Sequence, residues 1–147
     1  MKMKRGFTLI EILIVIAVIA ILLGITLPRF RGMQEEGSIS QAKSELKTLQ
    51  AALESYYIHN DNEYPDDLDD LEDAEPLIVP ELPTDPFNPG EDYGYYVGGT
   101  NDQYYVIYSV GPEGDGEAEI DDDNEVDETE NGDSCIYVSN AGQDTTP

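Results

Sequence analysis

The sequence has almost no positive charge outside its first third. No Lys or Arg follows Lys47, whereas the acidic residues before it are only Glu11, Glu35, Glu36 and Glu45, and the other 28 of the 32 Asp and Glu residues follow it. The formal net charge is −25. A surface this acidic repels polyanions, which argues against nucleic acid or an anionic membrane surface as a ligand of the C-terminal part. Its self-repulsion favours screening by salt or by bound divalent cations.

Cysteine and histidine are also scarce. Cys135 is the single cysteine, so no intramolecular disulfide can form, and one histidine cannot build a His and Cys metal cluster. The sequence shows no recognisable nucleophile and base pair and no phosphate-binding glycine loop, so nothing in it indicates an enzyme. With 147 residues and a very different N-terminal segment, the chain has room for one small head.

What the sequence does have is a long apolar run behind three basic residues at positions 2, 4 and 5. It extends over residues 7–27, which as a helix would measure about 31 Å, close to the ~30 Å hydrocarbon thickness of a bilayer. The run predicts a membrane span with its basic end in the cytoplasm and the C-terminal part on the far side. A secretory signal peptide and a plain anchor are the alternatives. Glu11 weakens both, because a carboxylate in a span costs about 2.5 to 3.5 kcal/mol and calls for a partner, and no A-x-A-like cleavage site follows the run.

The start of this run carries a more specific signal, the segment Lys4-Arg5-Gly6-Phe7-Thr8-Leu9-Ile10-Glu11. It resembles the processing site of type IV prepilins and type II secretion pseudopilins, in which a membrane prepilin peptidase cuts after the glycine and methylates the new N-terminus. The resemblance implies a leader peptide at residues 1–6, cleavage between Gly6 and Phe7, and N-methylation of Phe7. It also implies that Glu11 pairs with the N-terminal amine of a neighbouring subunit during filament assembly, which would give each buried charge a partner.

Pro28 follows the apolar run. Filament-forming relatives often carry a proline near this place, where the missing N–H and the ring would kink or locally melt a helix, and the resemblance gives Pro28 a role in assembly. Pro28 equally fits a simple membrane exit beside Arg29 and Arg31.

Residues 31–147 are predicted to form an amphipathic helix and an acidic globular head. Between residues 34 and 59, apolar residues recur every three or four positions and define one helix face: Ile39, Ala42, Leu46, Leu49, Leu53 and Tyr56. The opposite side, with Lys43, Lys47 and Glu54, is assigned to solvent or to another subunit. Runs rich in Tyr and Val predict strands at residues 93–98 and 103–110, and a third strand is expected at 134–139.

The predicted loop at residues 61–90 contains a possible short helix at 66–74 and the stretch Pro83-Thr84-Asp85-Pro86-Phe87. This stretch resembles the loop that leads into the sheet of major pseudopilins. The similarity favours the secretion branch of the family over adhesive pili.

Residues 111–130 are dense in carboxylates, the oxygen ligands that calcium prefers. The spacing does not match an EF-hand. The segment Ser109-Val110-Gly111-Pro112-Glu113-Gly114 resembles the calcium loop of major pseudopilins, with glutamate in place of an aspartate. The resemblance implies a calcium site with Asp115, Asp121 and Asp123 as candidate ligands, and a solvated acidic loop is the alternative.

The fold implied by the resemblance is α+β and type IV pilin-like: a long N-terminal helix packed on a small antiparallel β-sheet of three or four strands. Residues 7–30 would be its transmembrane and filament-core part. The implied protein is a single-pass inner-membrane subunit with its N-terminus in the cytoplasm and its head in the periplasm.

The implied function is to polymerise into a periplasmic pseudopilus that drives type II protein secretion. The implied partners are other copies of the chain, minor pseudopilins, the inner-membrane assembly platform and the prepilin peptidase. One alternative is a subunit of a surface type IV pilus or DNA-uptake pseudopilus. Another is a membrane-tethered calcium-binding module that does not polymerise.

Overall fold

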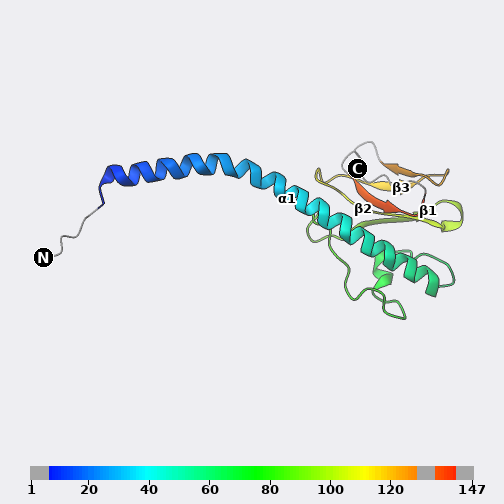
Figure 1. Ribbon diagram of the computed structural model, residues 1–147. Coiled ribbons are helices and arrows are strands. Elements are labelled where there is room, and N and C mark those ends of the chain that lie inside the picture. The colour runs from blue at the N-terminus through cyan, green and yellow to red at the C-terminus, as the bar shows by residue number, and fades with distance from the viewer. Residues whose placement is uncertain (1–6, 129–134, 142–147) are drawn as a thin grey trace. The chain divides into compact units, whose positions relative to one another are not determined.

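The computed structural model describes residues 7–128 and 135–141, without the side chains of residues 26–31 and 128. Its longest element is helix α1, Leu9–His59, which has 51 residues (Figure 1). The chain divides into two compact units, Met1–Glu36 and Gly37–Pro147, so that each unit contains part of this helix. Within the described residues, no helix combines the length and the apolar character needed to cross a membrane. The predicted span over residues 7–30 is therefore not confirmed and stays a prediction.

The second half of α1 packs on the head through the face that its periodicity predicts. Ala42, Leu46, Leu49 and Leu53 are all buried in one core cluster, and Ile39 and Tyr56 pack at its margin. Burying a leucine side chain contributes about 1.5 to 3 kcal/mol, so these contacts are a main source of stability for the head. The prediction for this face is confirmed.

In the described parts of the chain, the main sheet has three antiparallel strands in the order β1-β2-β5: β1 Gly94–Gly98, β2 Tyr104–Ser109 and β5 Ile136–Ser139. Its register pairs Tyr96 with Val106 and Ile107 with Val138. Successive side chains of a strand point to opposite faces. Accordingly, Tyr105 and Ile107 join the cluster with α1, whereas Val106 belongs to a second cluster on the other face. The α+β, type IV pilin-like fold class is confirmed.

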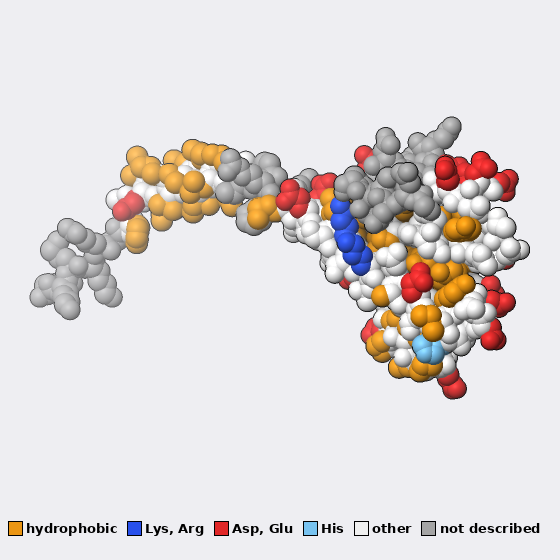
Figure 2. Space-filling model, turned by 45° about the vertical axis from the view of Figure 1, so that its right-hand side comes forward, with side chains coloured by type: hydrophobic (Ala, Val, Ile, Leu, Met, Phe, Trp, Pro, Cys, Tyr) orange, Lys and Arg blue, Asp and Glu red, His pale blue; other side chains and the backbone are white. Residues whose placement is uncertain are grey.

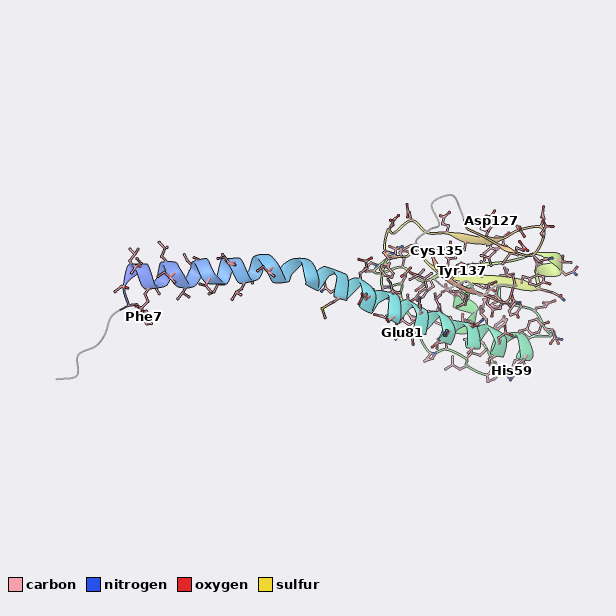
Figure 3. All side chains as sticks on the ribbon, turned by 45° about the horizontal axis from the view of Figure 1, so that its top comes forward. Phe7, His59, Glu81, Asp127, Cys135 and Tyr137 are labelled. Atoms are coloured by element: carbon pink, nitrogen blue, oxygen red, sulfur yellow. The ribbon has the colours of Figure 1, made fainter. Side chains whose placement is uncertain are left out.

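A two-stranded hairpin covers that second face (Figure 1). It consists of β3, Ala118–Ile120, and β4, Val126–Glu128, paired antiparallel. Ala118 and Ile120 are buried while Glu119 between them is exposed. Their buried neighbours in this layer include Cys135 and Tyr137, labelled in Figure 3. The predicted acidic loop over residues 111–130 therefore contains a hairpin, which the density of carboxylates concealed.

The connection between α1 and β1 contains one short 3₁₀ helix, η1, at Leu68–Leu71, and a second, η2 at Thr100–Asp102, lies between β1 and β2. Leu68 and Leu71 are buried in the cluster with α1. Asp67 caps η1, with Asp70 returning the hydrogen bond as in a capping box. A short helix was predicted at residues 66–74, and η1 confirms it in a tighter and shorter form.

Candidate functional site

The N-terminal start of α1 is fixed by a reciprocal pair of hydrogen bonds between Thr8 and Glu11. The Glu11 N–H donates to Thr8 Oγ1, and the Thr8 N–H donates to Glu11 Oε2, each over 3.4 Å. This is a capping box, in which a Thr before the first helical residue and a Glu three positions later satisfy backbone groups that the helix cannot. The spacing of Thr8 and Glu11 was a readable signal for this cap, and sequence reasoning missed it.

Glu11 lies in an otherwise apolar and exposed helical surface. All the large apolar side chains from Phe7 to Ile25 are exposed, and Phe7 and Leu9 are the extremes at 78% and 83%. Glu11 is the single charged residue between positions 7 and 25. Figure 2 shows this segment as a mostly orange surface with one red group. An apolar patch of this extent marks a surface that other molecules cover.

The predicted processing and assembly residues are placed only in part. Gly6 lies outside the described residues, and Phe7 precedes the first helical residue, Leu9 (Figure 3). Pro28 is within α1, whose backbone is helical through this position, and its side chain is not described. Cleavage after Gly6, methylation of Phe7 and the assembly roles of Glu11 and Pro28 stay predictions.

The predicted calcium ligands occupy different parts of the loop and hairpin. Asp121 closes the β3–β4 turn: its Oδ1 accepts the N–H groups of Asp123 at 3.0 Å and Glu125 at 2.8 Å. Asp115 and Asp123 are exposed. Across the described chain, no group of three or more His, Cys, Asp or Glu side chains is placed to hold a metal ion. The donors are chemically right for calcium but are not gathered into a site, and calcium binding stays a prediction.

Asp85 is a carboxylate that sequence reasoning noted only as part of a motif. It is 1% exposed, and its Oδ1 accepts the Ser109 hydroxyl at 2.8 Å and the Phe87 N–H at 2.9 Å. Its Oδ2 accepts the Val110 N–H at 2.9 Å. A buried carboxylate is tolerated when its oxygens are hydrogen-bonded in this way. Asp85 thus ties the Pro-rich loop to the end of β2, which is a structural reason for the Thr84-Asp85-Pro86 stretch.

Tyrosines of the head donate hydrogen bonds to glutamates of α1. The Tyr93 hydroxyl donates to Glu45 at 2.6 Å and the Tyr105 hydroxyl to Glu54 at 2.9 Å. Glu54 is exposed, as its assignment to the solvent-facing side predicts, and it also accepts this hydrogen bond from the sheet. Burial, followed by the adjacent glutamates, raises the pKa of both tyrosines above its usual value.

Tyr64 completes this network from the loop after the helix. Its hydroxyl donates to Glu54 at 3.3 Å and accepts a hydrogen bond from Asn140 Nδ2 at 3.1 Å. Burial and the Glu54 carboxylate raise the pKa of Tyr64 to about 12. Tyr64, Tyr93 and Tyr105 are thus packing and hydrogen-bonding residues that connect α1 to the rest of the head.

These features define a class of protein, the type IV pilin-like subunits: a capped helix with an exposed apolar first half, whose amphipathic second half packs on a small antiparallel sheet. Comparison with known families agrees. Residues 1–27 match the prokaryotic N-terminal methylation motif, and residues 29–128 match protein G of the type II secretion system. The chain belongs to the type II secretion system protein G family.

Individual relatives support the same assignment. The type II secretion system core protein G of Escherichia coli (strain K12) is 33% identical over 134 residues, which cover 82% of this chain and 88% of the relative. That of Pectobacterium carotovorum subsp. carotovorum is 32% identical over 125 residues, 76% of this chain and 78% of the relative. The type IV major pilin protein PilA of Myxococcus xanthus is 45% identical over 58 residues, 40% of this chain and 26% of the relative. No solved structure matches the chain.

The comparisons settle two predictions. The resemblance to major pseudopilins is confirmed, because the protein G model covers most of the head as well as part of α1. The prediction that the chain is not an enzyme is also confirmed, since this family consists of structural subunits of secretion systems.

Proposed function

We propose that the chain polymerises, through the apolar first half of α1, into a periplasmic pseudopilus that drives type II protein secretion. The observation that carries this proposal is the exposed apolar surface from Phe7 to Ile25 with its single carboxylate, in a member of the protein G family. Such a surface needs a cover. Before assembly the cover is the inner membrane, and after assembly it is the same segment of neighbouring subunits.

Glu11 is suited to direct the transfer of the apolar segment from the membrane into the filament. Its bonds to Thr8 are 3.4 Å long, beyond the usual 2.9 to 3.0 Å for N–H···O, and so are cheap to give up. When an apolar environment surrounds the carboxylate, an uncompensated charge becomes costly and a cationic partner becomes valuable. Cleavage before Phe7 would create an amine that supplies this partner in the neighbouring subunit.

The orientation follows from the charges of the chain. The basic residues at positions 2, 4 and 5 favour a cytoplasmic N-terminus, which directs the head to the periplasm. The partners in this arrangement are the prepilin peptidase, the inner-membrane assembly platform, minor pseudopilins and other copies of the chain. The membrane span itself is part of the proposal.

The acidic loop and hairpin are proposed to bind calcium through Asp115, Asp121 and Asp123. The support is their hard oxygen donors and the surplus of negative charge that a divalent cation would offset. A ligand that binds only the folded state at 100 times its Kd stabilises it by about 2.7 kcal/mol. We expect 1 mM calcium to raise the melting temperature of the wild type and not that of the Asp115→Asn, Asp121→Asn, Asp123→Asn triple variant. An equal shift in both proteins, or none in either, would rule out this site.

Processing provides the first test of the proposed class. The full chain is expressed in a bacterium that has a type II secretion machinery, extracted from membranes and weighed by intact-mass spectrometry beside a Gly6→Ala variant. The wild type is expected to lack residues 1–6 and to carry one additional methyl group, and the variant to remain uncut. An uncut wild type, or cleavage behind the apolar run, would contradict the proposal and favour a tethered or secreted module.

A further inference from the structure

Lys43 and Lys47 are the only basic residues of the unit Gly37–Pro147 apart from its one histidine. They lie four positions apart on α1 and therefore on one stripe of the helix. Figure 2 shows the described Lys and Arg side chains as a single blue strip on the head. We call this pair the lysine patch. Lys47 is exposed and Lys43 is half-buried.

The lysine patch borders a small groove between α1 and β5, which is an edge strand of the three-stranded sheet. The groove measures about 30 Å³, and its apolar lining includes Leu46, Ile136 and Val138. An apolar floor with two ammonium groups at its rim is suited to a protein surface that combines carboxylates with apolar or aromatic groups.

Charge identifies the partner that assembly would bring to this patch. Residues 48–147 contain many Asp and Glu residues and no Lys or Arg. Two heads placed side by side therefore repel each other unless cations lie where they meet. Among the head's own side chains the lysine patch is the source of such cations. A second copy of this chain is therefore the complementary partner.

The second copy offers a suitable acceptor at the far end of α1. A cleft of about 290 Å³ lies where α1 ends, and its lining includes Tyr56, Tyr64 and Asp66. A second cleft of about 510 Å³ is also lined by Tyr64 and Asp66. Tyrosine faces attract ammonium groups, and carboxylates add charge to that attraction. Asp61 and Glu63 line both clefts as well. We call these lining residues the acidic cleft.

We propose that the lysine patch of one subunit docks against the acidic cleft of the next subunit in the filament. This inference rests on the proposed polymerisation and adds a specific contact between heads. The two surfaces are different parts of one chain, so their contact is heterologous and can repeat into an open filament. Lys47 lies 12 positions before the end of α1 at His59 and Asp66 lies 7 positions after it, so the contact joins two different parts of the head.

The test is a charge swap in the full chain, assembled in a bacterium with a type II secretion machinery and measured as filament mass per cell. Lys47→Glu alone and Asp66→Lys alone are each expected to lower the filament mass by about three- to tenfold, the range for reversing an exposed ion pair. The double variant Lys47→Glu, Asp66→Lys is expected to recover to within about twofold of wild type. The recovery distinguishes a direct contact from a structural effect of either change.

A matched control places the new lysine on the hairpin: Lys47→Glu combined with Asp122→Lys has the same net charge and is expected to show no recovery. Recovery in this control instead of the swap, or wild-type filament mass with Lys47→Glu alone, would overturn the proposed contact. Melting temperatures of the detergent-extracted variants check that the heads remain folded. Wild-type chains that form no filament would contradict the proposed function itself, and filaments insensitive to the swap would contradict this contact alone.

Discussion

Leu13 and Leu49 belong to the same helix, yet Leu13 is 55% exposed and Leu49 is 1% exposed. The difference extends to their two units: apolar side chains cover the surface between Phe7 and Ile25, whereas in the head they form two clusters on the two faces of a sheet. The head is built to fold around its own core. The described part of the N-terminal unit instead exposes its apolar side chains, and under the proposed function other molecules cover them.

The largest difference between the units is expected when the same substitution, leucine to alanine, is made in each of them. Leu49→Ala is expected to lower the free energy of unfolding of the head by about 2 to 5 kcal/mol, because it leaves a cavity in the core under the sheet. Leu13→Ala is expected to leave head unfolding unchanged, since Leu13 is an exposed residue of the other unit and is not part of that core. Thermal unfolding of the detergent-extracted chains, followed by near-ultraviolet circular dichroism, measures both. A loss of similar size for Leu13→Ala would remove the distinction between the units.

The second prediction concerns Asp85, the buried carboxylate of the head. Asp85→Ala leaves the Ser109 hydroxyl and the N–H groups of Phe87 and Val110 without their acceptor, and is expected to lower stability by about 3 kcal/mol. Asp122→Ala removes an exposed carboxylate of the hairpin and is expected to change it by less than about 0.5 kcal/mol. Denaturant unfolding measures the loss of stability in the two variants. Equal losses would show that the hydrogen bonds of Asp85 do not stabilise the head.

Alkaline pH should act on the head through its tyrosines. The pKa of Tyr64 is raised from 10.0 to about 12 in the folded chain, so the folded state holds this proton more tightly than the unfolded state does. Its contribution to stability is fully present below pH 10 and is lost as the pH rises from about 10 to 12. We expect about 1 kcal/mol from Tyr64, less than the shift alone implies, because the ring is partly exposed to solvent.

The check is the melting temperature of wild type and Tyr64→Phe as a function of pH. The variant cannot ionise at this position and should lose less stability above pH 10. Parallel curves for the two proteins would mean that Tyr64 does not contribute to the alkaline loss.

An effect of similar size is expected in the hairpin turn. Asp121→Ala removes the acceptor of the Asp123 and Glu125 N–H groups, which remain reachable by water, and is expected to cost about 1 kcal/mol. Asp123→Ala serves as the control and should be close to neutral, because its exposed side chain does not hold the turn. Calcium-free buffer is required, so that turn stability and metal binding are measured separately.

The elements predicted most accurately from the sequence are those with a regular pattern of side chains. Ala42, Leu46 and Leu49 recur at helical spacing and are buried, and the Tyr- and Val-rich runs form β1 and β2. The hairpin was missed because three-residue strands carry little pattern and Glu119 lies between Ala118 and Ile120 in a strongly acidic stretch.

The side-chain contacts were predictable only in part. Burial of Asp85 depends on donors 24 and 25 residues away, and the bonds of Glu54 depend on how the sheet meets the helix. Neither follows from local spacing. The Thr8 and Glu11 cap, in contrast, is entirely local and could have been recognised from the sequence.

The proposed function gives the N-terminal unit the task of assembly, with Glu11 as its charged contact. The most direct measurement is filament mass per cell for wild type, Glu11→Ala and Thr8→Ala in a bacterium with a type II secretion machinery, with the melting temperature of each extracted head measured in parallel. Glu11→Ala is expected to reduce filaments by at least about 100-fold, since it leaves a buried amine without its partner, while Thr8→Ala removes only the cap, and head stability is unchanged in both. Normal filaments with Glu11→Ala would contradict the role of Glu11 in assembly.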